Sequence, residues 1–94
     1  MKFADLHLHT LFSDGTYTPG ELIVEAKRVG LSCIAVVDHD TVLGIEACQA
    51  AGSSNDLEVL SGVELTSEYE GLEIHILGYL IDHKNKTLRE KLAV

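Results

Sequence analysis

With 94 residues, 46% of them hydrophobic, the chain is long enough for one small domain, which we expect to span residues 1–94. Its net charge of −8, from seven basic and fifteen acidic side chains, excludes a basic groove for nucleic acid. No apolar run reaches the length needed to cross a membrane.

The two cysteines and the first residues indicate a cellular compartment. Cys33 and Cys48 match neither a zinc motif nor a disulfide framework, so we expect two small buried hydrophobic side chains. Asp5 and His7 interrupt any apolar segment typical of a signal peptide. These features favour a reducing, cytoplasmic location.

The first part of the chain predicts a strand, a helix and a second strand. Residues 2–8 alternate in polarity, as in a strand with one face buried. Thr18, followed by a proline and then by Glu21, is typical of a helix start, and Gly30 is suited to end that helix. The apolar run 33–37 predicts a strand covered on both faces.

The second part predicts a helix, a hairpin and a last helix. We expect Thr41 to cap a helix over residues 42–51 that ends at Gly52. Two strand-like runs follow, at residues 58–67 and 72–81, with a tight turn at 69–71 between them. Residues 86–94 predict a last helix. The whole order predicts an α/β fold of about four strands and three helices with short connections.

His7 and His9 lie two positions apart on the predicted first strand. Side chains at this spacing point to the same face, so both imidazoles can hold one metal ion. Asp5 lies on that face too, and we expect it to orient a ring nitrogen rather than to bind the metal. The simpler alternative is a pair of half-buried histidines, but burying two imidazoles is costly unless something pairs with them.

Two further polar groups follow the first two strands. Asp14 lies in a turn just beyond the first strand, close enough to offer a carboxylate to the same metals, although alone it is a common turn residue. Asp38, His39 and Asp40 follow the apolar strand at its carboxyl end, where α/β folds collect their active sites. We expect His39 to be a ligand and the two aspartates to be ligands or supporting groups.

Glu64 and His75 are related by the register of the predicted hairpin. If Glu70 and Gly71 are its two central residues, Glu64 lies opposite Leu77, and His75 lies diagonal to Glu64 on the same face. Both side chains then reach a shared metal. A three-residue loop would instead turn one of them to the other face.

The candidate ligands form one set rich in nitrogen and oxygen: His7, His9, Asp14, His39, Glu64 and His75. Such a set suits zinc, manganese or iron. The fifth histidine, His83, is flanked by polar residues, and we expect it on the surface. The sequence has no serine or cysteine triad, P-loop or dinucleotide fingerprint, so water activated by metal ions is the expected nucleophile.

These motifs resemble those of the PHP family, named for polymerase and histidinol phosphatase. The matching segments, in the family's order, are Asp5–Thr10, Ser13–Thr16, Asp38–Thr41, Gly62–Glu64 and His75–Tyr79. The chain looks most similar to stand-alone members that act as metal-dependent phosphoesterases on nucleotides or short nucleic-acid ends. A small phosphorylated, nucleotide-like substrate is therefore implied.

The resemblance also implies a distorted (β/α)7 barrel with two or three divalent ions at its mouth, of which this chain resembles the N-terminal portion. By motif, one metal would be held by His7 and His9, a second by Asp14 and His39, and a third by His75, with Glu64 bridging the first and third. Family members are much longer and take further ligands from later segments. An incomplete barrel has an open sheet edge, which favours self-association.

Two alternatives belong to other classes. An amidohydrolase-type carbon–nitrogen hydrolase also begins with His-x-His on its first strand, but the early Asp38-His39-Asp40 segment and the lack of a suitable bridging lysine count against it. The other alternative is a non-catalytic metal-binding remnant, or a module that needs a partner chain. The short length is its best support.

Overall fold

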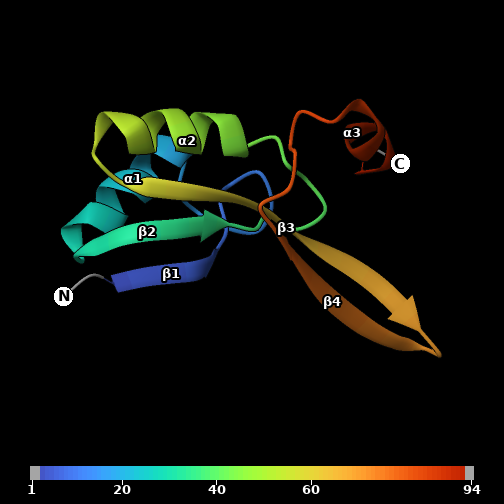
Figure 1. Ribbon diagram of the computed structural model, residues 1–94. Helices are drawn as coiled ribbons and strands as arrows, with labels where there is room; N and C mark the ends of the chain where they lie inside the picture. Colours follow the sequence, from blue (N-terminus) through green and yellow to red (C-terminus); the bar gives the residue numbers. More distant parts are fainter. Residues whose placement is uncertain (1–2, 93–94) are drawn as a thin grey trace.

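The computed structural model describes residues 3–92 and contains one sheet with the strand order β1-β2-β3-β4 (Figure 1). Its elements are β1 (Phe3–Leu8), α1 (Pro19–Arg28), β2 (Leu31–Val36), α2 (Ile45–Ser54), β3 (Glu58–Tyr69), β4 (Leu72–Tyr79) and α3 (Lys86–Leu92). The predicted α/β arrangement of four strands and three helices is confirmed. Position 2 of the predicted first strand and positions 93–94 of the last helix lie outside the described residues.

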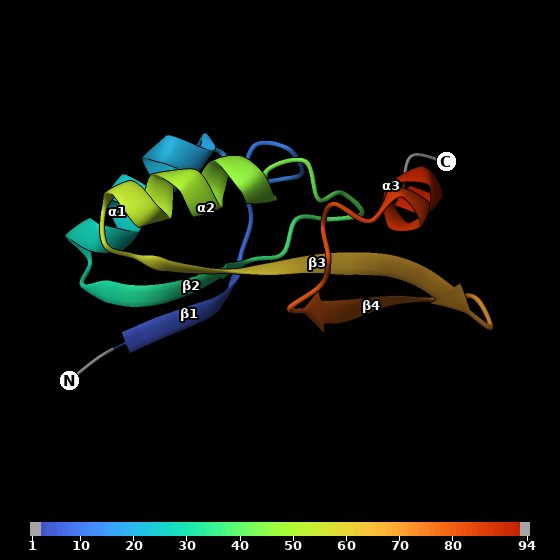
Figure 2. The same cartoon turned by 45° about the horizontal axis from the view of Figure 1, so that its top comes forward.

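Strand β3 changes its partner along its length. Its first part, Glu58–Ser61, pairs in parallel with β2, which pairs in parallel with β1. Its second part, Gly62–Tyr69, pairs antiparallel with β4. The β3–β4 hairpin therefore extends away from the parallel strands, as Figures 1 and 2 show.

Helices α1 and α2 lie side by side on one face of the parallel strands, and α3 lies near the base of the hairpin (Figures 1 and 2). The larger core cluster, between the two helices and the sheet, contains Leu22, Ile23, Ala26, Ile34, Val36, Cys48 and Leu57. A smaller cluster under α3 contains Val42, Ile45 and Val63, with Leu65, Ile81, Leu88 and Leu92 packed against it. Burial of these side chains holds the carboxyl ends of the strands in place.

Helix α1 begins as the sequence predicts. The Thr18 hydroxyl accepts a hydrogen bond from the Glu21 amide at 3.2 Å, and the Glu21 carboxylate accepts one from the Thr18 amide at 2.9 Å. Gly30, at φ +90°, follows the end of the helix. Strand β2 then starts at Leu31, before the predicted residue 33, because Leu31 already pairs with Phe3.

The predicted limits of the second helix are wrong at both ends. Helix α2 starts at Ile45 after Gly44, and the Thr41 hydroxyl accepts a hydrogen bond from the Leu43 amide instead of capping the helix. Gly52 lies inside the helix, which continues to Ser54. A Cβ atom at Gly52 would lie 2.6 Å from a methyl group of Val59, so this glycine allows close packing and does not end the helix.

The β3–β4 turn has the predicted two central residues. Tyr69 pairs with Leu72, and Glu70 and Gly71 between them have φ values of +51° and +80°. Strand β4 ends at Tyr79 and not at the predicted residue 81, because Leu80 turns into the left-handed region at φ +57°.

The two cysteines differ in burial. Cys48 is fully buried in the core, and burial, with a smaller contribution from the charge of Asp38, raises the pKa of its thiol to about 12. Cys33 is only partly buried, which corrects the prediction of two buried side chains. Neither forms a disulfide within the described residues. Among residues 3–92, none of the helices is long and apolar enough to cross a membrane.

Candidate metal centre

Four imidazole rings surround the carboxylate of Glu64, a β3 residue that is only 6% exposed. Its Oε1 atom lies 2.7 Å from Nε2 of His7 and 3.1 Å from Nε2 of His9. Its Oε2 atom lies 2.7 Å from Nδ1 of His75 and 3.7 Å from Nδ1 of His39. One buried carboxylate thus joins imidazoles from three separate segments of the chain.

Asp14 adds a second carboxylate on the solvent side of this cluster. One of its oxygens is hydrogen-bonded to Nδ1 of His9, and the other lies 3.1 Å from Nε2 of His39. The Asp14 side chain is 63% exposed, against 8% for that of Glu64. The cluster therefore has one buried and one open carboxylate.

The backbone explains why distant residues meet here. The Val37 amide donates to the Leu8 carbonyl at 2.8 Å, which holds the ends of β1 and β2 together. Beyond β2, the Glu64 amide donates to the Asp38 carbonyl at 3.0 Å, and the Asp40 amide donates to the Glu64 carbonyl at 2.9 Å. These bonds form a parallel bridge between His39 and Glu64.

The hairpin register brings His75 to the same place. Glu64 pairs with Leu77 and Thr66 pairs with His75, as predicted from a two-residue turn. Glu64 and His75 are therefore diagonal neighbours on one face of the hairpin. Their contact at 2.7 Å follows from this register.

The donor atoms form three overlapping groups: His7, His9 and Glu64; His9, Asp14 and His39; and His39, Glu64 and His75. Within each group the donor atoms lie within 4.8 Å of one another, close enough to share one metal ion. The grouping places Glu64 in the first and third sets, the two that the family resemblance expects it to bridge. It also places His9 and His39 in two sets each.

The charges of the cluster stabilise one another. Burial alone would raise the pKa of Glu64, but hydrogen bonds with His7 and His75 lower it below 4.5. Burial alone would lower the pKa of His9, yet Asp14 and Glu64 raise it above 6.5. The hydrogen bond to His9 lowers the pKa of Asp14 below 3.8. The two carboxylates therefore favour a protonated His9.

Asp38 lies apart from the ring of donors and binds the loop that follows β1. It is 1% exposed and accepts hydrogen bonds from the Thr10 amide at 2.6 Å, the Thr10 hydroxyl at 2.6 Å and the Ser13 hydroxyl at 2.8 Å. These three bonds occupy both of its oxygens. Of the two expected roles, the geometry favours that of a supporting group.

Asp5 and Asp40 each contact a backbone amide. Asp5 accepts a hydrogen bond from the His7 amide at 3.0 Å and does not reach a ring nitrogen, which corrects the predicted role of that carboxylate. Asp40, at φ +53°, accepts a hydrogen bond from the Thr66 amide at 2.9 Å. Asp5 thus binds the backbone of β1, and Asp40 binds the backbone of β3 two residues beyond Glu64.

Three residues that shape the cluster were not predicted. Thr10 is fully buried and donates to Asp38. Gly15 lies so close to the His9 and Thr10 carbonyls that a Cβ atom would be 2.8 Å from the latter. Tyr79 donates from its hydroxyl to the Leu6 carbonyl at 2.7 Å, from one edge strand to the other. All three lie within the matching motif segments, so the family resemblance is the signal that could have marked them.

His83 belongs to none of the three groups, in agreement with its exclusion from the ligand set. It is, however, only partly exposed, and its Nε2 atom is buried without a hydrogen-bond partner among the described residues. The predicted surface position is therefore only partly correct.

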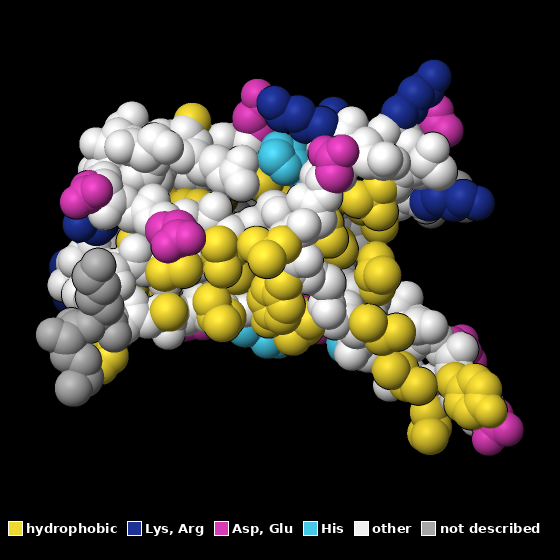
Figure 3. All heavy atoms as spheres, in the orientation of Figure 1, with side chains coloured by type: hydrophobic (Ala, Val, Ile, Leu, Met, Phe, Trp, Pro, Cys, Tyr) yellow, Lys and Arg dark blue, Asp and Glu magenta, His cyan; other side chains and the backbone are white. Residues whose placement is uncertain are grey.

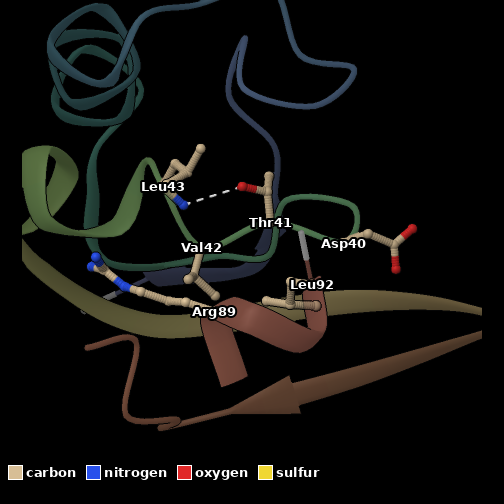
Figure 4. Close-up of a pocket in the computed structure, with 6 residues that line it drawn as sticks. All are labelled: Asp40, Thr41, Val42, Leu43, Arg89 and Leu92. Carbon is tan, nitrogen blue, oxygen red and sulfur yellow. Dashed lines mark hydrogen bonds between the residues drawn. The ribbon is translucent and has the colours of Figure 1, made fainter. Parts of the chain in front are cut away.

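A cavity of about 210 Å³ lies beside α3, but it is separate from the imidazoles. Its lining residues are Asp40, Thr41, Val42, Leu43, Arg89 and Leu92. In Figure 4 the Asp40 carboxylate points away from Val42 and Leu92. The cavity is mainly aliphatic and holds none of the four clustered histidines.

Comparison with known proteins identifies related sequences. The model of the PHP domain family matches residues 5–91. A 5'-3' exoribonuclease of Haemophilus influenzae is 38% identical over 103 residues, covering 99% of this chain and 38% of its own. A 3',5'-nucleoside bisphosphate phosphatase of Chromobacterium violaceum is 36% identical over 82 residues, covering 87% of this chain and 29% of its own.

Solved structures show the same local fold. A Chromobacterium violaceum protein described as an amidohydrolase, with bound sulfate and no metal, has a TM-score of 0.90 and 33% identity, covering 96% of this chain and 32% of its own. A Bifidobacterium adolescentis protein described as a candidate metal-dependent phosphoesterase has a TM-score of 0.89 and 36% identity. The match covers 98% of this chain and 32% of that protein. The chain thus spans about a third of the length of the relatives it matches.

Proposed function

The chain belongs to the PHP domain family, and we propose that its histidine and carboxylate cluster is a metal centre for the hydrolysis of a phosphate ester. The observation that carries this proposal is the set of three donor groups around Glu64. Four imidazoles on one buried carboxylate are costly to desolvate unless cations or protons balance them. Relatives named as an exoribonuclease and a phosphatase supply the reaction class.

The residues present fit divalent metal ions. The proposed ligands are His7, His9, Asp14, His39, Glu64 and His75. Only nitrogen and carboxylate oxygen donors take part, a set that suits manganese, zinc or iron. We expect two or three ions, because Glu64 belongs to two of the groups and presents a different oxygen to each.

When bound, the ions would lower the pKa of a water molecule and neutralise charge on a phosphate. The side chains of the chain orient this site. Glu64 is held from both sides by His7 and His75, so its two oxygens are fixed in direction. Asp14 and His7, which are 63% and 52% exposed, lie on the open side where a substrate would approach.

We expect the substrate to be a small phosphorylated, nucleotide-like molecule. The names of the relatives include both a nuclease and a nucleoside bisphosphate phosphatase, whose substrates share a phosphate ester on a nucleoside. The net charge of −8 argues against a long basic groove, so contacts are expected to centre on the phosphate and the metals. The chain would correspond to the N-terminal portion of a larger (β/α)7 barrel.

One neighbour gives a reason to keep a second reaction class. The solved structure from Chromobacterium violaceum is described as an amidohydrolase, and its local fold is the same. A carbon–nitrogen hydrolase is therefore the second candidate. A third possibility, a metal-binding module that acts only with further protein, is supported by the fraction of its relatives that the chain covers.

The test combines metal loading with a substrate panel. The purified chain is loaded separately with Mn²⁺, Zn²⁺ and Fe²⁺ and assayed on a nucleoside bisphosphate, a 5'-phosphorylated oligonucleotide, an amide and a cyclic imide. We expect metal binding and hydrolysis of the phosphate esters alone. Cleavage of the amide or imide would favour the second candidate, and metal binding without any hydrolysis would favour the third. A chain that binds no metal would refute the proposal.

A further inference from the structure

We propose that Asp38 is the positioning residue for Asp14, so that occupation of the His9–Asp14–His39 group by a metal depends on a carboxylate that does not touch it. This inference rests on the metal centre proposed above. It assigns Asp38 a specific effect on one of the three groups, beyond a general role in folding.

Asp38 joins two segments that each carry a member of this group. Its carboxylate accepts hydrogen bonds from Thr10 and Ser13, in the loop that contains Asp14. Its own backbone directly precedes His39, and its carbonyl accepts the Glu64 amide at 3.0 Å. The position of the Asp14 loop relative to His39 is therefore set by one buried side chain.

The hydrogen bonds continue from Asp38 to both sides of Asp14. Thr10, held by Asp38 through its amide and hydroxyl, accepts the Ser13 amide at 3.1 Å and the Gly15 amide at 2.9 Å on its carbonyl. The two neighbours of Asp14 are thus both bound to Thr10. The Asp14 side chain itself is mostly exposed, and its described contacts are with His9 and His39. Its place depends on the loop and not on core packing.

The surroundings of Asp38 are built to hold a charged carboxylate. A Cβ atom on Gly44 would lie 3.2 Å from Oδ2 of Asp38 and 3.1 Å from the Thr10 hydroxyl, so this glycine leaves room for the pair. Gly44 is also the residue before α2, whose N-terminal end favours a negative charge. Three charge-assisted hydrogen bonds and a helix end together offset the burial of Asp38.

The test measures stepwise Mn²⁺ binding to the 94-residue chain by equilibrium dialysis. We expect Asp14→Ala and Asp38→Ala to weaken the same single binding step, each by about 10- to 100-fold. The double variant should be no weaker than either single variant, because both remove the same arrangement. Asp38→Asn, which keeps an acceptor for the Thr10 amide, should recover part of the loss.

Two further variants separate positioning from general stability. Ser13→Ala removes one of the three hydrogen bonds and should give a smaller loss at the same step, which keeps the test decisive if Asp38→Ala does not fold. Ile34→Val alters the buried core without touching the loop and should leave all binding steps unchanged. In the metal-free chain, hydrogen exchange at the Ser13 and Gly15 amides should speed up in Asp38→Ala but not in Ile34→Val.

The possible failures are distinguishable. Three outcomes would overturn the positioning role and leave the metal centre intact. In the first, the affinity losses of Asp14→Ala and Asp38→Ala multiply in the double variant. In the others, Asp38→Ala binds Mn²⁺ as the wild-type chain does, or Ile34→Val loses as much affinity as Asp38→Ala. A wild-type chain that binds no Mn²⁺, Zn²⁺ or Fe²⁺ would overturn both.

Discussion

Glu64 and His75 lie diagonally across the β3–β4 hairpin, with Oε2 of one 2.7 Å from Nδ1 of the other. The contact depends on the two-residue turn, which pairs Glu64 with Leu77 and Thr66 with His75. A slip of one residue would turn His75 to the opposite face of the hairpin. The turn therefore determines the geometry of the site, although it lies at the far end of the hairpin.

Insertion of one glycine between Glu70 and Gly71 should remove at least one bound metal ion per chain, because it shifts the register that brings His75 to Glu64. Elemental analysis of the purified protein measures the change. Glu70→Asn is the matched control, since asparagine tolerates the positive φ of that position and should leave the metal content unchanged. An insertion variant with full metal content would show that His75 is not a ligand.

Replacing His7 and His9 together by alanine should abolish occupation of two of the three donor groups, since His9 belongs to both. The metal content after dialysis against excess Zn²⁺ should fall accordingly, with circular dichroism to verify the fold. His83→Ala, outside the cluster, should bind as much metal as the wild-type chain. If the double alanine variant bound as much metal as His83→Ala, His7 and His9 could not be assigned as metal ligands.

The metal-free chain should be most stable between about pH 4.5 and 6.5. The raised pKa of His9 stabilises the fold fully below 6.5, and this contribution is lost as the pH rises through the folded-state value. The lowered pKa values of Asp14 and Glu64 stabilise it above 3.8 and 4.5, and that contribution is lost as the pH falls through their folded-state values.

Urea midpoints measured from about pH 4 to 8.5 test this expectation, with Asp14→Asn predicted to flatten the alkaline side. Bound Zn²⁺ should reverse the trend, because metal competes with protons for the imidazoles and binds better at higher pH. A metal-free chain that is more stable at about pH 8 than at about pH 5.5 would contradict the charge arrangement described here.

Gly15→Ala should destabilise the protein by about 1–3 kcal/mol, because the added methyl group overlaps the His9 and Thr10 carbonyls. It should also weaken metal binding by displacing the neighbouring Asp14. Gly20→Ala is the control: a methyl group there would have free space within 4 Å beyond its own helix, and alanine favours the helix by up to roughly 1 kcal/mol. Chemical denaturation and metal titration report the two effects.

The chain should self-associate through its outer strands. The described sheet has β1 and β4 at its edges, and the hairpin carries Ile74 and Ile76 at 40% and 52% exposure. Figure 3 shows hydrophobic side chains along this hairpin. Ile76→Lys should shift sedimentation profiles toward the monomer, whereas Val24→Lys on exposed α1 should not. Identical sedimentation profiles for the two variants would argue against self-association through the hairpin strands.

Local sequence rules predicted the parts of the structure that depend on local chemistry. The capping pair of Thr18 and Glu21 and the Glu70-Gly71 turn both formed as expected, and the turn fixed the relation of Glu64 to His75. In these cases two or three neighbouring residues determine the backbone.

The wrong predictions involve contacts between distant segments. Gly52 has the local character of a helix end, but its place in α2 is set by the approach of Val59. Asp5 is the exception, because its hydrogen bond to the His7 amide is a local contact within its own strand. The support that Asp38 gives to Thr10 spans 28 residues and has no periodic signal. The metals and the cytoplasmic location stay predictions.

The change of partner along β3 gives the site a mechanical property. Glu64 and His75 lie on the arm that leaves the parallel strands after Ser61, whereas His7, His9 and His39 are carried by or follow the parallel strands. Because the Glu64 amide and carbonyl are hydrogen-bonded to Asp38 and Asp40, Glu64 is tied to the segment that carries His39. Bending of the arm beyond Glu64 would therefore move His75 alone relative to the other imidazoles.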